Sequence, residues 1–201
     1  TPSSRGGKSK GNIITAETVQ QLLQHQILRY DKGGDEHYNT ISALIKSMRG
    51  SDPSAALYYL ARMLSGGESP LFIARRMVIF ASEDIGMADP KALLLAISAM
   101  QAFDFVGMPE GQINLAHITV YLACAPKNNR AYLGLLEAKA DVEATLNEPI
   151  PLHILNAPTG LMKNLGFGRG YKYPHNYSAE EIKHEQYLPD KLKDKKYYRP
   201  K

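Results

Sequence analysis

The 201-residue sequence contains one cysteine and no tryptophan. Cys124 cannot form an intramolecular disulfide, which indicates a reducing compartment. It lies in the apolar stretch VYLACAP, where we expect a small core residue rather than a nucleophile. No apolar run is long enough to cross a bilayer and no signal-peptide pattern opens the chain. The sequence therefore predicts a cytoplasmic protein without a membrane partner.

Catalytic and metal-binding patterns are also lacking. Gly7-Lys8-Ser9 has the ending of a P-loop, but Pro2 occupies the position of the first glycine, and neither flanking element is predicted. No serine lies in a G-x-S-x-G setting. The histidines show no i,i+4 pair and no cysteine companion, so no metal is expected. They are His25, His37, His117, His153, His175 and His184. We expect no catalytic residue and no cofactor in this chain.

Charge is distributed unevenly. Residues 1–12 hold three basic and no acidic side chains, and residues 151–201 hold ten basic and five acidic ones. Residues 13–150 hold 11 basic and 15 acidic side chains. A nucleic-acid backbone is attracted to positive charge, so any such contact is expected at the ends of the chain.

Three helix starts share one pattern, a short oxygen-bearing side chain followed by proline. Such a side chain caps the free N–H groups of the first turn, and proline at the next position has a preset φ. The three pairs are Asp52-Pro53, Ser69-Pro70 and Asp89-Pro90. Glycines follow the first two apolar runs, at Gly66-Gly67 and Gly86, where a left-handed residue closes a helix.

Apolar residues recur at helical spacing from residue 15 to residue 146, and no strand is predicted before Pro149. The fold class is therefore all-α. We divide the chain into a disordered lead-in (1–12), a helix (13–34), a helical body (35–148) and an extended arm rich in tyrosine, glycine and proline (149–201). One short helix is expected within residues 178–186.

Several long segments resemble one AAA+ ATPase family. They include YDKGGDEHYNTISALIKSMRGSD, SDPSAALYYLARML, PLFIARRMVIFASEDIGMADP, MPEGQINLAHITVYLACAPKNN and NAPTGLMKNLGFGRGYKYPH. The family is the replication-associated recombination protein A group, which includes the Werner helicase-interacting ATPases and is related to clamp loaders. The resemblance covers residues 14–198 of this chain, and the part of the family's proteins that they resemble is the C-terminal region.

This resemblance implies a helical bundle like the clamp-loader C-terminal collar, with residues 13–34 as the end of the AAA+ lid. It implies a homotetramer, and a parent protein that uses ATP and magnesium in an N-terminal module. That parent is expected to act on DNA in replication, recombination and repair, at stalled forks. The expected partners are DNA, single-strand-binding protein and other replication factors, near the nucleoid.

Glu83 and Asp84 are adjacent acids at a predicted helix end. They could form an acid/base pair or a magnesium site, but helix neighbours point about 100° apart. We therefore favour structural ion pairs with nearby cations, which are Arg62, Arg75 and Arg76. A helical enzyme that uses these acids with His117 is the less favoured alternative.

The arm interleaves cations with aromatic rings, at Lys163, Arg169, Tyr171, Lys172 and Tyr173. Cations neutralise phosphates and rings stack on unpaired bases, so this is the best candidate for a DNA contact. Packing of the tyrosines on the protein's own helices is the alternative we prefer. A stand-alone nucleic-acid-binding domain is the main rival to an assembly module.

The wide apolar face of residues 57–64 is more than one neighbouring helix layer would cover. It favours self-association of the chain.

Overall fold

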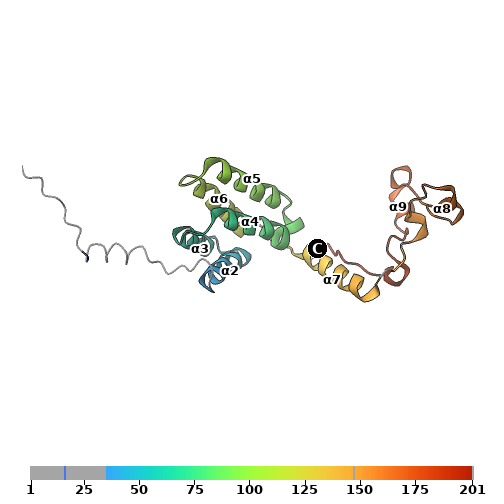
Figure 1. Ribbon diagram of the computed structural model, residues 1–201, viewed down its shortest axis with the longest axis horizontal. Coiled ribbons are helices and arrows are strands. Elements are labelled where there is room, and N and C mark those ends of the chain that lie inside the picture. The colour runs from blue at the N-terminus through green and yellow to red at the C-terminus, as the bar shows by residue number, and fades with distance from the viewer. Residues whose placement is uncertain (1–15, 17–34, 147, 201) are drawn as a thin grey trace, which may run out of the picture. The chain divides into compact units, whose positions relative to one another are not determined.

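The computed structural model describes residues 16, 35–146 and 148–200, and every regular element among them is a helix. The longer ones are α2 (Asp35–Arg49), α3 (Pro53–Ser65), α4 (Pro70–Phe80), α5 (Lys91–Val106), α6 (Gly111–Cys124) and α7 (Arg130–Thr145) (Figure 1). The predicted all-α class is confirmed. None of the described helices is long and apolar enough to cross a bilayer. The lead-in (1–12) and the helix expected at 13–34 lie outside the described residues, apart from residue 16.

The capping residues of α3 and α4 lie where the sequence places them. Asp52 is the N-cap of α3, and its side chain accepts a hydrogen bond from the Ala55 N–H at 2.9 Å. Ser69 is the N-cap of α4 and accepts from the Phe72 N–H at 3.3 Å. In each helix proline occupies the first turn, where no N–H donor is needed.

The start of α5 differs by one residue. Pro90 holds the N-cap position, and Asp89 just before it accepts from the Lys91 N–H at 3.1 Å. The second oxygen of Asp89 accepts from the Tyr121 hydroxyl at 2.5 Å, and this bond raises the pKa of Tyr121. One carboxylate therefore caps α5 and joins it to α6.

α3 ends at a left-handed glycine. Gly67 has φ 77°, its N–H donates to the Leu64 carbonyl, and the Glu68 N–H donates to the Met63 carbonyl, both at 3.0 Å. This pair of bonds is the Schellman motif, which satisfies carbonyls at a helix end and reverses the chain within a few residues. The sharp turn brings α4 back onto the same core as α3.

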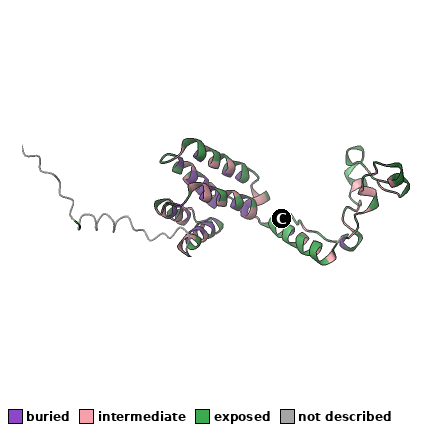
Figure 2. Ribbon diagram, viewed as in Figure 1, coloured by how far each residue is buried: buried purple, intermediate pink, exposed green. Residues whose placement is uncertain are grey.

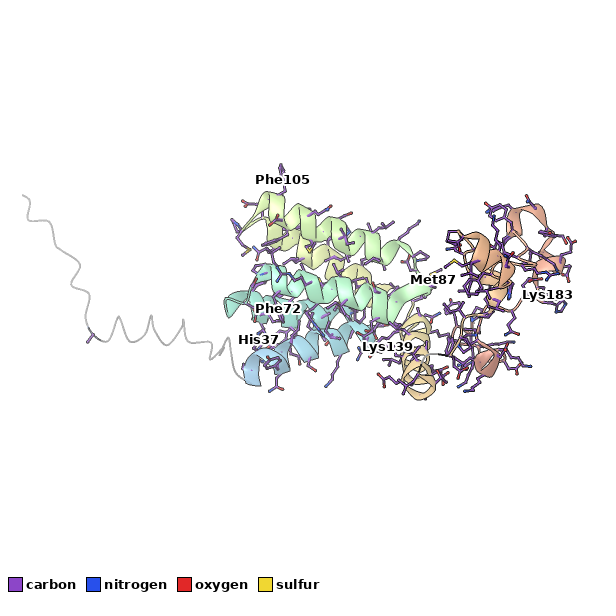
Figure 3. The ribbon with its side chains drawn as sticks, turned by 45° about the vertical axis from the view of Figure 1, so that its right-hand side comes forward. His37, Phe72, Met87, Phe105, Lys139 and Lys183 are labelled. Carbon is purple, nitrogen blue, oxygen red and sulfur yellow. The ribbon has the colours of Figure 1, made fainter. Side chains whose placement is uncertain are left out.

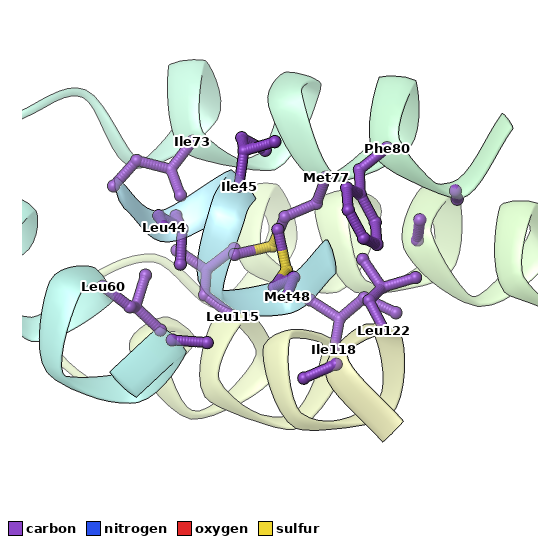
Figure 4. Close-up of a cluster of buried hydrophobic side chains, with 14 of the residues drawn as sticks. Leu44, Ile45, Met48, Leu60, Ile73, Met77, Phe80, Leu115, Ile118 and Leu122 are labelled. Carbon is purple, nitrogen blue, oxygen red and sulfur yellow. The ribbon is translucent and has the colours of Figure 1, made fainter. Parts of the chain in front are cut away.

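Four helices, α2, α3, α4 and α6, supply the centre of the core, and α5 packs against α4 and α6 (Figure 4). Met48 on α2 and Met77 on α4 are both fully buried in it. The buried Thr119 donates to the Leu115 carbonyl at 2.7 Å, so its hydroxyl is satisfied. The large buried side chains include Leu44, Met48, Met63, Ile73, Met77, Phe80, Ile85, Leu115 and Leu122.

The chain divides into two compact units between Lys127 and Asn128. The boundary predicted from the sequence is Pro149, whereas the observed division groups α7 with the arm rather than with the helical body. Figure 2 shows buried residues throughout α2–α6, whereas most of α7 is exposed. α7 has one buried residue, Gly134, whereas α2, α3, α4, α5 and α6 each bury three or more residues.

The arm contains short helical turns, of which α8 (Gly160–Asn164) and α9 (Ala179–Ile182) are α-helical. α9 lies within the stretch 178–186 where one short helix is expected, and a capping box between Ser178 and Glu181 starts it. α8 begins at Thr159, whose side chain accepts from the Met162 N–H at 3.3 Å. Local capping therefore orders a segment that has no helical apolar period.

Candidate functional site

The two adjacent acids lie on η1 (Ala81–Ile85), a widened helical turn that continues α4 and ends at Gly86 with φ 48°. Asp84 is only 7% exposed. It accepts two hydrogen bonds from the Arg49 guanidinium, at 2.5 Å from Nε and 3.0 Å from Nη2. Glu83 lies 3.8 Å from Arg49. The bond to Asp84 raises the pKa of Arg49.

These contacts correct the predicted ion-pair partners. The predicted partners of the acids are Arg62, Arg75 or Arg76, but the observed partner is Arg49, from the last turn of α2. A bidentate pair with a buried carboxylate fixes the end of α2 against η1. Because Asp84 is committed to this pair, the acids act in packing and offer no free acid/base couple.

The three arginines first assigned to the acids have different environments. Arg62 forms an ion pair with Glu36 on α2. Arg75 is exposed on α4, and Arg76 is partly buried with an Nε atom that has no hydrogen-bond partner. Neither Arg75 nor Arg76 has an ion pair among the described residues.

Two residues considered as nucleophile or base are exposed. Cys124 is exposed at the end of α6, so its assignment to the core is wrong. His117 is exposed beside a cavity of about 210 Å³ between α5 and α6. No group of three or more potential metal-ligating side chains occurs within the described ranges.

The arm presents its cations in two ways. Lys172 lies 2.8 Å from Glu185 and 3.5 Å from the Glu181 carbonyl, and the bond to Glu185 raises its pKa. Lys163 and Arg169 are exposed and have no ion pair in the described part of the chain. Of the predicted DNA contacts, Lys172 therefore has an internal structural role, while Lys163 and Arg169 remain open to a ligand.

The aromatic rings beside these cations are also open. Tyr171 is 46% exposed, Tyr173 53% and Tyr177 42%. Between α8 and these rings the backbone passes through left-handed glycines at 166, 168 and 170, with φ 88°, 71° and 82°. Residues that carry a side chain rarely adopt a positive φ, so glycine is required for this series of turns. The loop after α8 thus carries exposed rings and the exposed Arg169, while Lys163 lies on α8 itself.

The C-terminal strap, which we define as residues 190–200, is held to α7 by ion pairs. Glu137 pairs with Arg199 at 3.2 Å, Asp141 pairs with Lys195 at 3.0 Å, and Glu148 just after α7 pairs with Lys191. The Tyr197 hydroxyl also donates to Asp141 at 2.9 Å. Glu137 and Asp141, on one face of α7, therefore bind the strap.

Large apolar side chains remain exposed on α5 and α7. On α7 the apolar residues at helical spacing face solvent, and Leu135 among them is 58% exposed. Phe105 at the end of α5 is 92% exposed and points away from the helical body (Figure 3). By contrast, most of the α3 face is covered, and among its large apolar residues only Tyr58 stands exposed. The exposed set comprises Leu93, Leu94, Leu95, Phe105 and Val106 on α5, Tyr132, Leu133, Leu135, Leu136 and Val142 on α7, and Leu146 just after α7.

This helical body and strapped arm are the C-terminal part of an AAA+ protein: the chain belongs to the family described as MgsA AAA+ ATPase C terminal, whose model matches residues 50–201. A second model, AAA C-terminal domain, matches residues 2–49. The two models meet at the end of α2, yet α2 packs on α3, so one core crosses the junction.

Several similar proteins carry names from the same AAA+ ATPase family. The chain is 46% identical to the replication-associated recombination protein A of Coxiella burnetii and 42% identical to that of Escherichia coli K12, covering 94% of this chain and 43% and 42% of those proteins. It is 44% identical to ATPase WRNIP1 of Dictyostelium discoideum, over 97% of this chain and 22% of that protein. The chain spans less than half the length of each.

Proposed function

We propose that this chain is the assembly module of a DNA-dependent AAA+ ATPase, and that it joins subunits into a homotetramer. The observation that carries the proposal is that α5, in the first unit, and α7, in the second, each expose several large apolar side chains. Monomers rarely expose contiguous apolar patches of more than a few hundred Å², and obligate interfaces of about 2,000 Å² or more resemble a divided core. The number four rests on the family alone, and closed symmetry would limit the assembly to that size.

Charge substitutions on the apolar set test this proposal. Leu94→Asp on α5 and Leu135→Asp on α7 place a carboxylate in the expected interface, and each should lower the mass measured by light scattering. The matched control is Leu161→Asp, because Leu161 is 69% exposed but lies on α8, outside the set. Loss of assembly in the control, or unchanged mass in both test variants, would contradict an interface on α5 and α7.

In the complete protein, ATP and magnesium are proposed to bind in a separate N-terminal module. This chain would contribute assembly and no catalytic step. We propose that the complete protein acts at stalled forks and single-strand/double-strand junctions, with single-strand-binding protein and replication factors as partners, in the cytoplasm near the nucleoid. Metal-dependent ATP turnover by the purified 201-residue chain would contradict this division of roles.

A second candidate function is a DNA contact by the arm. It is favoured by the exposed Lys163 on α8 and by the exposed Arg169, Tyr171 and Tyr173 in the loop that follows. Rings that stack on bases and cations that neutralise phosphates are the usual elements of single-strand binding. Salt-dependent binding of a labelled oligothymidylate to the chain tests this function separately from assembly.

A further inference from the structure

A pocket of about 420 Å³ opens between α2 and α4 in the first unit, and we call it the α2–α4 pocket. Its apolar wall includes Ile41, Ile45 and Phe72, and the two isoleucines are at most 8% exposed, which makes that wall part of the packed core. Lys46 and Arg76 line the same pocket. An apolar wall with a few convergent charged groups is typical of a ligand site.

The cations of this pocket differ in how far they are neutralised. Arg49 also lines the pocket, but its guanidinium is committed to Asp84. The side chains of Lys46 and Arg76 have no ion pair or hydrogen bond to any described residue, and the Nε of Arg76 is shielded from solvent without an acceptor. A shielded donor without an acceptor costs free energy. An anionic group in this pocket would therefore meet two cations that have no carboxylate of their own.

The surroundings decide which kind of anion fits. Residues 35–127 contain seven basic and nine acidic side chains, so this part of the first unit has no net positive charge that would attract a nucleic-acid backbone. The pocket instead combines a local pair of cations with aliphatic and aromatic side chains. Arginine matches a carboxylate with two parallel hydrogen bonds, and the apolar wall can bury one side chain.

We propose that the α2–α4 pocket binds an acidic peptide segment of a partner protein. A carboxylate of the peptide pairs with Arg76 and Lys46, and a neighbouring apolar side chain packs against Ile41, Ile45 and Phe72. This inference goes beyond the assembly role, because the pocket is formed within one chain and does not need a second subunit.

The test uses fluorescence anisotropy with a fluorescein-labelled peptide of four aspartates followed by leucine, on the 201-residue chain. Arg76→Gln and Lys46→Gln should each weaken binding roughly tenfold, the size expected for one lost charge-assisted hydrogen bond. Arg75→Gln is the matched control. It removes the same charge one residue away on α4 but does not line the pocket. It should change the affinity by less than about twofold, since exposed unpaired charges contribute little.

Two altered peptides separate the parts of the site. Replacing the aspartates with asparagines removes the charge, and replacing the leucine with alanine removes the apolar group, so both should bind more weakly. Thermal unfolding of each variant checks that the fold is retained, and Lys46→Gln keeps the test valid if Arg76→Gln does not fold.

Three results would overturn the proposal. The first is no binding of the aspartate–leucine peptide to the wild-type chain. The second is an equal loss in Arg75→Gln and Arg76→Gln, which would indicate diffuse charge attraction. The third is binding of an oligothymidylate that depends on Arg76 while the peptide does not bind, which would make this a nucleic-acid site.

Discussion

The main chain of Tyr197 crosses α7 directly over Gly134, so closely that a Cβ on Gly134 would lie 2.4 Å from the Tyr197 carbonyl oxygen. Gly134 is the one buried residue of α7. Glycine in a helix interior ordinarily costs stability relative to alanine, by about 1 kcal/mol. Its presence here is explained by the strap, because any larger residue would displace the backbone that crosses it.

Gly134→Ala should therefore release the strap even though alanine favours the helix. We expect amide hydrogen exchange to increase in residues 190–200, while the first unit stays protected. Gly160→Ala is the matched control, because a Cβ there meets nothing within 4 Å. Unchanged protection of the strap in Gly134→Ala would show that the crossing does not hold it.

The pH dependence of the strap is expected to follow Asp141. Hydrogen bonds from Lys195 and Tyr197 lower the pKa of Asp141 below its ordinary value of 3.8. When the pKa of a carboxyl group is lower in the folded chain than in the unfolded chain, the ionised group stabilises the fold at pH values above the pKa of the unfolded chain. This contribution is lost as the pH falls through the pKa of the folded chain. Strap protection should thus be constant above about pH 5 and fall below pH 3.8.

Asp141→Asn supplies the control for that profile, because it keeps the side-chain shape and removes the titration. Its hydrogen-exchange protection should be lower at neutral pH, and the acid step assigned to Asp141 should be missing. A wild-type transition centred near pH 6 would instead point to a group other than this carboxylate.

The Arg49–Asp84 pair should contribute measurably to the stability of the first unit. Arg49→Ala leaves the buried Asp84 without its partner, and we expect a loss of about 1–3 kcal/mol in the free energy of unfolding, since Arg49 itself is half exposed. Arg75→Ala, an exposed residue on α4, should change it by less than about 0.5 kcal/mol. Equal effects in urea unfolding of the two variants would contradict this ion-pair role.

Some lysines and arginines of the arm are unpaired and others form ion pairs, and a salt titration of DNA binding can tell the two groups apart. If the arm binds single-stranded DNA, Lys163→Ala and Arg169→Ala should each weaken binding and lower the salt slope by roughly one unit. The control is Lys191→Ala, which removes a cation already paired with Glu148. Unchanged affinity and slope in both test variants would exclude the arm as the DNA contact.

The fold could be predicted from local signals, and the contacts between distant residues could not. Asp52 and Ser69 cap helices through bonds that span three residues, and such patterns are visible in the sequence. The partner of Asp84 is 35 positions away, and the partners of Asp141 lie more than 50 positions away. Their choice depends on how helices pack, which apolar period alone does not specify.

Burial of the apolar stripes was equally hard to predict. The stripes of α3 and α7 look alike in sequence, yet Leu60 is buried and Leu135 is exposed. Gly134 was the available signal for the strap, since a glycine in the middle of a helical run costs stability and usually has a packing reason.

The mass of the 201-residue chain in solution tests the assembly role most directly. Light scattering on a gel-filtration column, with tens of micromolar protein loaded, should give about four times the 22.3 kDa of one chain. A stable dimer would contradict the stoichiometry and retain self-association. A mass near 22.3 kDa would contradict the proposal that the apolar faces of α5 and α7 join subunits.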